Sequence, residues 1–128
     1  MNLTRRHFTA ALGASALTLP TLRAARASDG FVALRAGTTK AQLLATGEPQ
    51  TDVWAYGNSV PGPILRVRQG ERLKVRFFND LPQASTVHWH GIRIDNAMDG
   101  VAGLTQDAVP AGASFDYDFI APDAGTYW

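Results

Sequence analysis

Apolar and polar residues alternate in short runs along residues 31–120, the pattern of half-buried β-strands. None of these runs continues with the 3.6-residue period of an amphipathic helix. The runs, each an expected strand, are 31–36, 42–45, 52–56, 64–68, 72–77, 86–94 and 114–120. Short strands at this spacing are typical of an antiparallel sandwich or barrel. The pattern therefore predicts an all-β fold.

Glycines and prolines mark where these strands should end. Residues 57–63 hold two prolines and two glycines, which predicts a rigid bend. The runs 64–68 and 72–77 flank a turn with Gly70, which predicts a β-hairpin. Residues 96–110 show no sustained period and are expected to be a long connection. In the run 114–120 the aromatic residues should share one face.

The chain stops shortly after a turn at 122–125, on the aromatic pair Tyr127-Trp128. Residues 126–128 resemble the start of a further strand. We therefore expect a domain that lacks its C-terminal strands. Such a domain would expose a sheet edge and part of its core, which favours aggregation.

Residues 1–27 differ from the rest of the chain. Paired arginines at Arg5-Arg6 precede a mildly apolar run, and Ala25-Arg26-Ala27 has the small-x-small pattern of a cleavage site. The segment resembles a twin-arginine signal peptide, which implies export to the periplasm or secretion. An amphipathic membrane or partner helix is the alternative. The apolar run is too short for a bilayer span of about 20 residues. The expected organisation is a signal peptide at 1–27 and one domain at 28–128.

Removal of residues 1–27 changes the charge of the protein. The whole chain has a formal net charge of +1, but four of its 12 basic residues lie in that segment, which leaves eight basic against 11 acidic residues. Nothing in the remainder favours a nucleic-acid partner, and no membrane partner is expected after cleavage. The basic residues that alternate with apolar ones are expected on the solvated face of two strands: Arg66, Arg68, Arg72, Lys74 and Arg76.

The chain contains no cysteine. An exported protein without cysteine has no disulfide framework, so its core alone must hold the fold. A blue-copper electron-transfer site requires a cysteine thiolate beside two histidines. A complete site of that kind is therefore excluded within this chain.

His88 and His90 are the candidate metal ligands. Residues i and i+2 of a strand point to the same side, about 6.6 Å apart, so both imidazoles can line one surface while Trp89 points to the other. Two neutral imidazoles suit zinc, copper, iron or nickel, but two ligands do not complete a site. The alternative is that both histidines are ordinary half-buried sheet residues.

Other chemistries have less support. A Ser-His-Asp arrangement would need Asp95 or Asp99, yet the sequence has no Gly-x-Ser-x-Gly elbow. The carboxylates of Asp116 and Asp118 are expected on a solvated strand face. Asp95, Asp99 and Asp107 could bind calcium, but they do not have the spacing of an EF-hand loop.

Several short motifs follow one another in a specific order. They are Pro61-Gly62-Pro63, Arg66, Gly70, Asn79, His88-Trp89-His90-Gly91, Asp99-Gly100, Thr105-Gln106, Pro110, Gly112 and Gly125-Thr126-Tyr127-Trp128. This order resembles the first cupredoxin domain of the multicopper oxidases, which include laccases and bacterial copper-resistance oxidases. The resemblance covers essentially all of residues 28–128. It departs from the family at Gly57-Asn58, where Asn-Gly is more common.

The resemblance implies a cupredoxin-like Greek-key β-sandwich with copper as its cofactor. In the family's first motif the two histidines bind different coppers, so His88 would be a type 2 ligand and His90 a type 3 ligand. Residues 125–128 resemble the start of a second motif, which continues in the family with two more type 3 histidines. The chain ends before that pair.

The implied function is that of the copper-binding N-terminal domain of a multicopper oxidase. The intact family enzymes oxidise a reducing substrate and reduce dioxygen at a trinuclear copper cluster built from the first and last domains. This chain alone is therefore expected to bind copper weakly and to have no oxidase activity. Two alternatives remain, which are a small copper-binding cupredoxin-like module completed by another chain and a metal-free structural relative.

Overall fold

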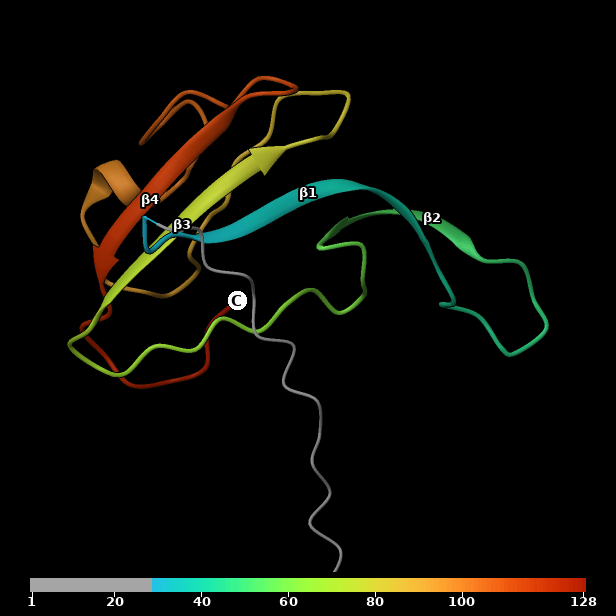
Figure 1. Ribbon diagram of the computed structural model, residues 1–128, viewed down its shortest axis with the longest axis horizontal. Coiled ribbons are helices and arrows are strands. Elements are labelled where there is room, and N and C mark those ends of the chain that lie inside the picture. The colour runs from blue at the N-terminus through green and yellow to red at the C-terminus, as the bar shows by residue number, and fades with distance from the viewer. Residues whose placement is uncertain (1–28) are drawn as a thin grey trace, which may run out of the picture.

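The computed structural model describes residues 29–128, so the predicted signal peptide lies outside the described residues. The regular elements are β1 (Val32–Ala41), β2 (Thr51–Tyr56), β3 (Arg72–Asn79), the 3-10 turn η1 (Asn96–Met98) and β4 (Ser114–Ile120). The strands form one four-stranded sheet in the order β2-β1-β3-β4 (Figure 1). Strand β1 runs antiparallel to β2 and parallel to β3, and β3 runs antiparallel to β4. Within 29–128, no helix is long and apolar enough to cross a membrane.

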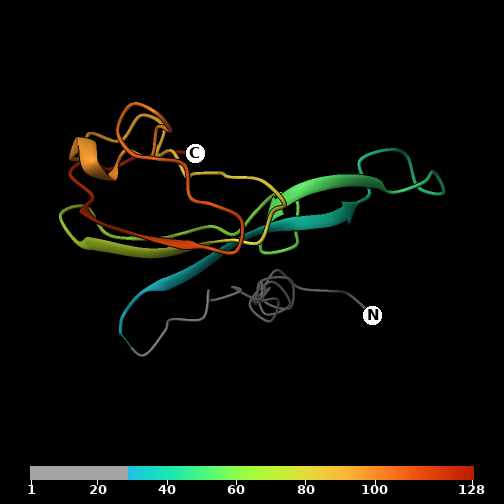
Figure 2. The same cartoon turned by 90° about the horizontal axis from the view of Figure 1, so that it is seen from above.

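Strand β1 is longer than the sequence pattern predicts, and the predicted strand at 42–45 is wrong. The backbone of β1 continues to Ala41 because its second half pairs with β2, where Gly37 lies opposite Ala55. Residues 42–50 form a loop instead. The side-chain amide of Gln42 donates to three loop carbonyls, those of Leu44, Ala45 and Glu48, at 3.3, 3.1 and 3.1 Å. These bonds favour a turn over an extended strand. The hairpin of β1 and β2 extends away from the rest of the sheet (Figures 1 and 2).

The predicted hairpin of 64–68 with 72–77 is also wrong. Strand β3 is paired on one edge with β1 and on the other with β4, so neither edge is free for residues 64–68. The alternation in 64–68 has another cause. Leu65 and Val67 are partly buried, and Leu65 packs against the core, whereas the other three residues are exposed. One-sided burial thus produces a strand pattern without strand pairing.

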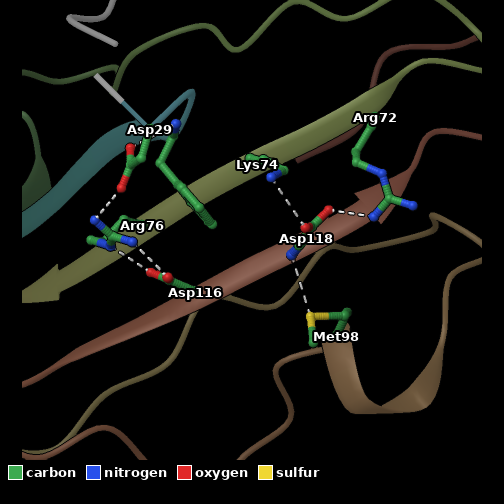
Figure 3. A network of polar contacts seen from close by, with 8 residues as sticks. Asp29, Arg72, Lys74, Arg76, Met98, Asp116 and Asp118 are labelled. Carbon is green, nitrogen blue, oxygen red and sulfur yellow. Dashed lines mark hydrogen bonds and ion pairs between the residues drawn. The ribbon is translucent and has the colours of Figure 1, made fainter. Parts of the chain in front are cut away.

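Strand β4 has the two faces that its sequence predicts. Tyr117 and Phe119 are buried on the inner face. On the outer face, Arg76 makes two bonds to Asp116, at 2.7 and 2.8 Å, and a third to Asp29 at 2.7 Å (Figure 3). The hydrogen bonds to Asp116 and, to a smaller extent, to Asp29 raise the pKa of Arg76.

Asp118 makes a second set of ion pairs on the same face. It contacts Arg72 at 2.6 Å and Lys74 at 3.7 Å (Figure 3). The basic residues of β3 therefore lie on a polar face, as predicted, and are paired across strands with the acidic residues of β4.

The core lies between the inner face of the sheet and the segment that connects β3 to β4. Figure 2 shows η1 and much of this connection stacked on one side of β3 and β4. The connection contributes buried residues to the core, and the sheet provides their partners; together they include Val75, Phe77, Val87, Trp89, Val109, Tyr117 and Phe119. An irregular layer thus covers the sheet face on which the histidine segment lies.

Asn79 closes β3 as the buried polar residue of this core, with 0% of its surface exposed. Its amide nitrogen donates to the carbonyls of Gln83 and Val109 at 2.8 and 2.9 Å. Its amide oxygen accepts from the backbone N–H of Leu81 at 3.2 Å. One side chain thereby joins the start of the connecting segment to its end.

Candidate metal centre

The histidine segment is not a regular strand, so the predicted strand at 86–94 is wrong in that respect, and a turn follows Trp89, with the N–H of Ile92 donating to the Trp89 carbonyl at 3.2 Å. Beside it, an isolated bridge pairs Ser85 with Val109. The alternation of side chains nevertheless holds. Trp89 is buried with 8% exposed, whereas His88 and His90 are exposed. Their ring centroids lie 5.6 Å apart with the ring planes at 88°. The two imidazoles are neighbours on one side, as predicted.

Aromatic packing holds the middle of this segment. Trp89 contacts the rings of Tyr117 and Phe119 edge to face, with centroids 5.5 and 5.1 Å away. The hydroxyl of Tyr117 accepts a hydrogen bond from the backbone N–H of Val87 at 3.1 Å. Burial raises the pKa of Tyr117, so this hydroxyl stays protonated at neutral pH. Strand β4 therefore fixes the backbone on which both histidines stand.

His88 has a defined hydrogen-bond partner. Its Nδ1 lies 2.9 Å from the backbone carbonyl oxygen of Asp99, and one carboxylate oxygen of Asp99 lies 3.4 Å away. A carbonyl oxygen only accepts, so Nδ1 carries the proton and donates it. The lone pair of the neutral ring then resides on Nε2. The His88 side chain as a whole is 42% exposed.

His90 lies against the end of the chain. Its ring stacks on Trp128 with centroids 4.4 Å apart and planes at 21°, and its backbone N–H donates to the Trp128 carbonyl at 2.9 Å. Residues 126–128 are not a regular strand, in contrast to the prediction, although this bond places them beside the histidine segment. Trp128 is 85% exposed, so one face of this stacked pair is open to solvent.

The structure does not gather the other predicted candidates around the histidines. Within residues 29–128, no three or more His, Cys, Asp or Glu side chains form a group that could hold a metal ion. Asp95 instead caps η1, where it accepts from the N–H of Ala97 at 2.9 Å. Asp99 reaches His88 mainly through its backbone. This role was not predicted from the sequence, although Asp99-Gly100 is among the family motifs.

The donors fit a metal that accepts imidazole nitrogen. His88 presents its free Nε2, and His90 lies next to it on the same side. A hydrogen bond from the far nitrogen of a ligand histidine to a carbonyl is the usual support of imidazole ligands. The histidine pair thus supplies two oriented ligands, which leaves further ligands to other parts of a complete site.

Comparisons with known proteins agree with this geometry. The family model "Multicopper oxidase" matches residues 37–128. Multicopper oxidase MmcO of Mycobacterium tuberculosis is 37% identical over 120 residues, which cover 92% of this chain and 24% of that protein. Copper resistance protein A homolog of Pseudomonas syringae pv. tomato is 38% identical over 87 residues, which cover 68% of this chain and 15% of that protein. The chain therefore spans a quarter or less of these curated relatives.

Solved structures give the same result. Lac15 from a marine microbial metagenome is 55% identical with a TM-score of 0.74, over 77% of this chain and 26% of that one. A multi-copper oxidase from Pseudomonas thermotolerans is 45% identical with a TM-score of 0.71, over 75% of this chain and 23% of that one. This likeness confirms the predicted all-β, cupredoxin-like fold class. The chain belongs to the multicopper oxidase family, which implies a copper cofactor.

Proposed function

We propose that residues 28–128 are the first cupredoxin domain of a multicopper oxidase. In this proposal His88 is a ligand of the type 2 copper and His90 a ligand of the type 3 pair. The observation that carries the proposal is the pair of imidazoles 5.6 Å apart, one of which has its Nδ1 bound to a backbone carbonyl. The family supplies the assignment of each histidine to a particular copper.

The chain's own residues hold and orient two of the ligands. Trp89 anchors the segment in the core, and Asp99 fixes the ring of His88. In the intact enzyme, the bound coppers would pass electrons from a reducing substrate to dioxygen. Because two imidazoles do not complete such a cluster, we propose that this chain alone binds copper weakly and lacks oxidase activity.

We also propose that residues 1–27 direct export by the twin-arginine route to the periplasm or to the outside of the cell. The expected result is an exported protein whose N-terminus is Ser28. Replacement of both Arg5 and Arg6 by lysine should abolish export, because the pair is the recognised element. Unchanged export of that variant, measured by cell fractionation and N-terminal sequencing, would contradict this assignment.

Copper titration tests the site. His7 is the remaining histidine and lies outside the described residues, so His7→Ala serves as a matched control. We expect His7→Ala to bind Cu(II) as the parent chain does, and His88→Ala and His90→Ala each to bind at least tenfold more weakly, about 1.4 kcal/mol. Equal affinities in all four proteins would refute the site and favour a metal-free relative.

Oxygen uptake tests the activity claim separately. With copper and a phenol present, we expect the chain alone to consume oxygen no faster than copper and phenol without protein. Oxygen-linked oxidation that requires His88 and His90 would refute the claim of inactivity while supporting the ligands.

A further inference from the structure

We propose that Gly100 is a positioning residue for His88. In this inference, the missing side chain of Gly100 lets the backbone at 99–100 lie against the backbone at 87–88. That close approach keeps the Asp99 carbonyl on Nδ1 of His88 and leaves Nε2 as the nitrogen that binds metal. The inference deepens the proposed function and rests on it for the role of Nε2.

The backbone at Gly100 has no room for a side chain. Gly100 is buried and has a φ of +77°, a conformation that residues with a Cβ rarely adopt. A Cβ built there would overlap the carbonyl oxygen of Val87, and it would lie 2.7 Å from the Val87 carbonyl carbon and 3.2 Å from the His88 nitrogen. All three atoms belong to backbone, so no flexible side chain can turn aside. Any side chain at Gly100 must push the two segments apart.

The Asp99 carbonyl is fixed from both sides of this contact. Before it, the turn η1 is capped by Asp95, and the N–H of Asp99 donates to the Asn96 carbonyl at 3.2 Å. After it, the N–H of Val101 donates to the hydroxyl of Thr105 at 2.8 Å, and the Thr105 N–H returns to the Val101 carbonyl at 2.9 Å. The loop is therefore braced around Gly100, and a shift there would move the Asp99 carbonyl away from His88.

Two oxygens of Asp99 compete for the proton on Nδ1. The carbonyl lies at 2.9 Å and the carboxylate at 3.4 Å, so the carbonyl is the better placed acceptor. Only the carbonyl depends on the close approach at Gly100, since the carboxylate belongs to a side chain that can rotate. The variant Asp99→Ala removes the carboxylate and keeps the carbonyl. It therefore separates the two acceptors.

The matched control is Gly103, three residues further along the same loop. Gly103 has a φ of +75°, and a Cβ there would meet nothing within 4 Å. Gly100→Ala and Gly103→Ala thus carry the same backbone penalty, and only the first adds a steric overlap with the histidine segment. A difference between the two variants reports the overlap alone.

The tautomer of His88 is the readout, measured by long-range proton–nitrogen NMR on the copper-free chain at alkaline pH, where imidazole is neutral. We expect the Nδ1–H form in the parent chain, in Asp99→Ala and in Gly103→Ala. In Gly100→Ala we expect the Nε2–H form that a histidine side chain prefers when it is free in water. Cu(II) affinity should fall at least tenfold in Gly100→Ala and stay unchanged in Gly103→Ala.

Three results would overturn the inference. They are an Nε2–H form in the parent chain, loss of the Nδ1–H form in Asp99→Ala, and retention of the Nδ1–H form in Gly100→Ala. The first two need no folded Gly100 variant, so the inference stays testable if Gly100→Ala unfolds. The tautomer is read without copper, and failure of the proposed function would appear separately as unchanged copper affinity in His88→Ala.

Discussion

Removing the side chain of Trp89 should unfold much of the histidine segment, and the structure sets the size of the effect. Burial of up to about 200 Å² of indole surface is worth roughly 5 kcal/mol as an upper bound at about 25 cal/mol per Å². The edge-to-face contacts with Tyr117 and Phe119 add about 0.5–1.5 kcal/mol each. One feature opposes these gains, since the buried indole Nε1 has no hydrogen-bond partner among the described residues, at a cost of about 1–3 kcal/mol.

The net prediction is that Trp89→Ala lowers the free energy of unfolding by about 3–5 kcal/mol. Trp89→Phe keeps an aromatic ring in the core and removes the unpaired N–H, so we expect a loss below about 1.5 kcal/mol. The assay is urea unfolding followed by far-ultraviolet circular dichroism, which does not depend on the fluorescence of the replaced residue. Complete loss of cooperative unfolding in Trp89→Ala also meets the expectation.

The same two variants connect the core to the site. Because burial of Trp89 sends His88 and His90 to the other side, Trp89→Phe should keep the copper affinity of the parent chain and Trp89→Ala should lose it. A cost below about 1 kcal/mol for Trp89→Ala would refute the argument that this residue anchors the segment.

Two further predictions concern stability. Asn79→Ala should lower the free energy of unfolding in urea by about 2–4 kcal/mol, because it leaves the buried N–H of Leu81 without its acceptor and removes two hydrogen bonds to backbone carbonyls. A change within about 0.5 kcal/mol would contradict this role. Stability should also fall with pH below the ordinary aspartate value of 3.8, because the pKa of Asp29 is lowered by the N–H of Phe31 and that of Asp123 by Arg93. A carboxyl group whose pKa is lower in the folded state stabilises the protein above its unfolded pKa, and this stabilisation is lost as the pH falls through the folded pKa. A variant with Asn at both positions should therefore lose less stability than the parent between about pH 5 and about pH 3. An equal loss in the two proteins would contradict the assignment.

Sequence patterns predicted the faces of the elements better than their pairing. The alternation in β4 correctly placed Tyr117 and Phe119 inside, because burial on one face is a local property of a strand. The same alternation at 64–68 suggested a hairpin that does not exist. Which strands pair depends on contacts distant in sequence, and β3 pairs with β1 across about 40 residues of chain.

The candidate site shows the same limit. The spacing of His88 and His90 predicted their common side, although a turn begins at His90 and the segment is not a regular strand. It did not predict that the Asp99 carbonyl would fix the tautomer of His88, because every residue has a carbonyl and only the fold brings this one to 2.9 Å. Gly100 provides the sequence signal for that contact, but its meaning depends on knowing which backbone it approaches.

Pulsed electron paramagnetic resonance on the chain carrying His7→Ala, loaded with one equivalent of Cu(II), tests the central claim most directly. In that variant His88 and His90 are the remaining imidazoles, so any coupling from the far nitrogen of a bound imidazole must come from them. We expect imidazole coupling that either His88→Ala or His90→Ala weakens and that the double replacement abolishes. A spectrum without imidazole coupling would contradict the claim that this pair binds copper.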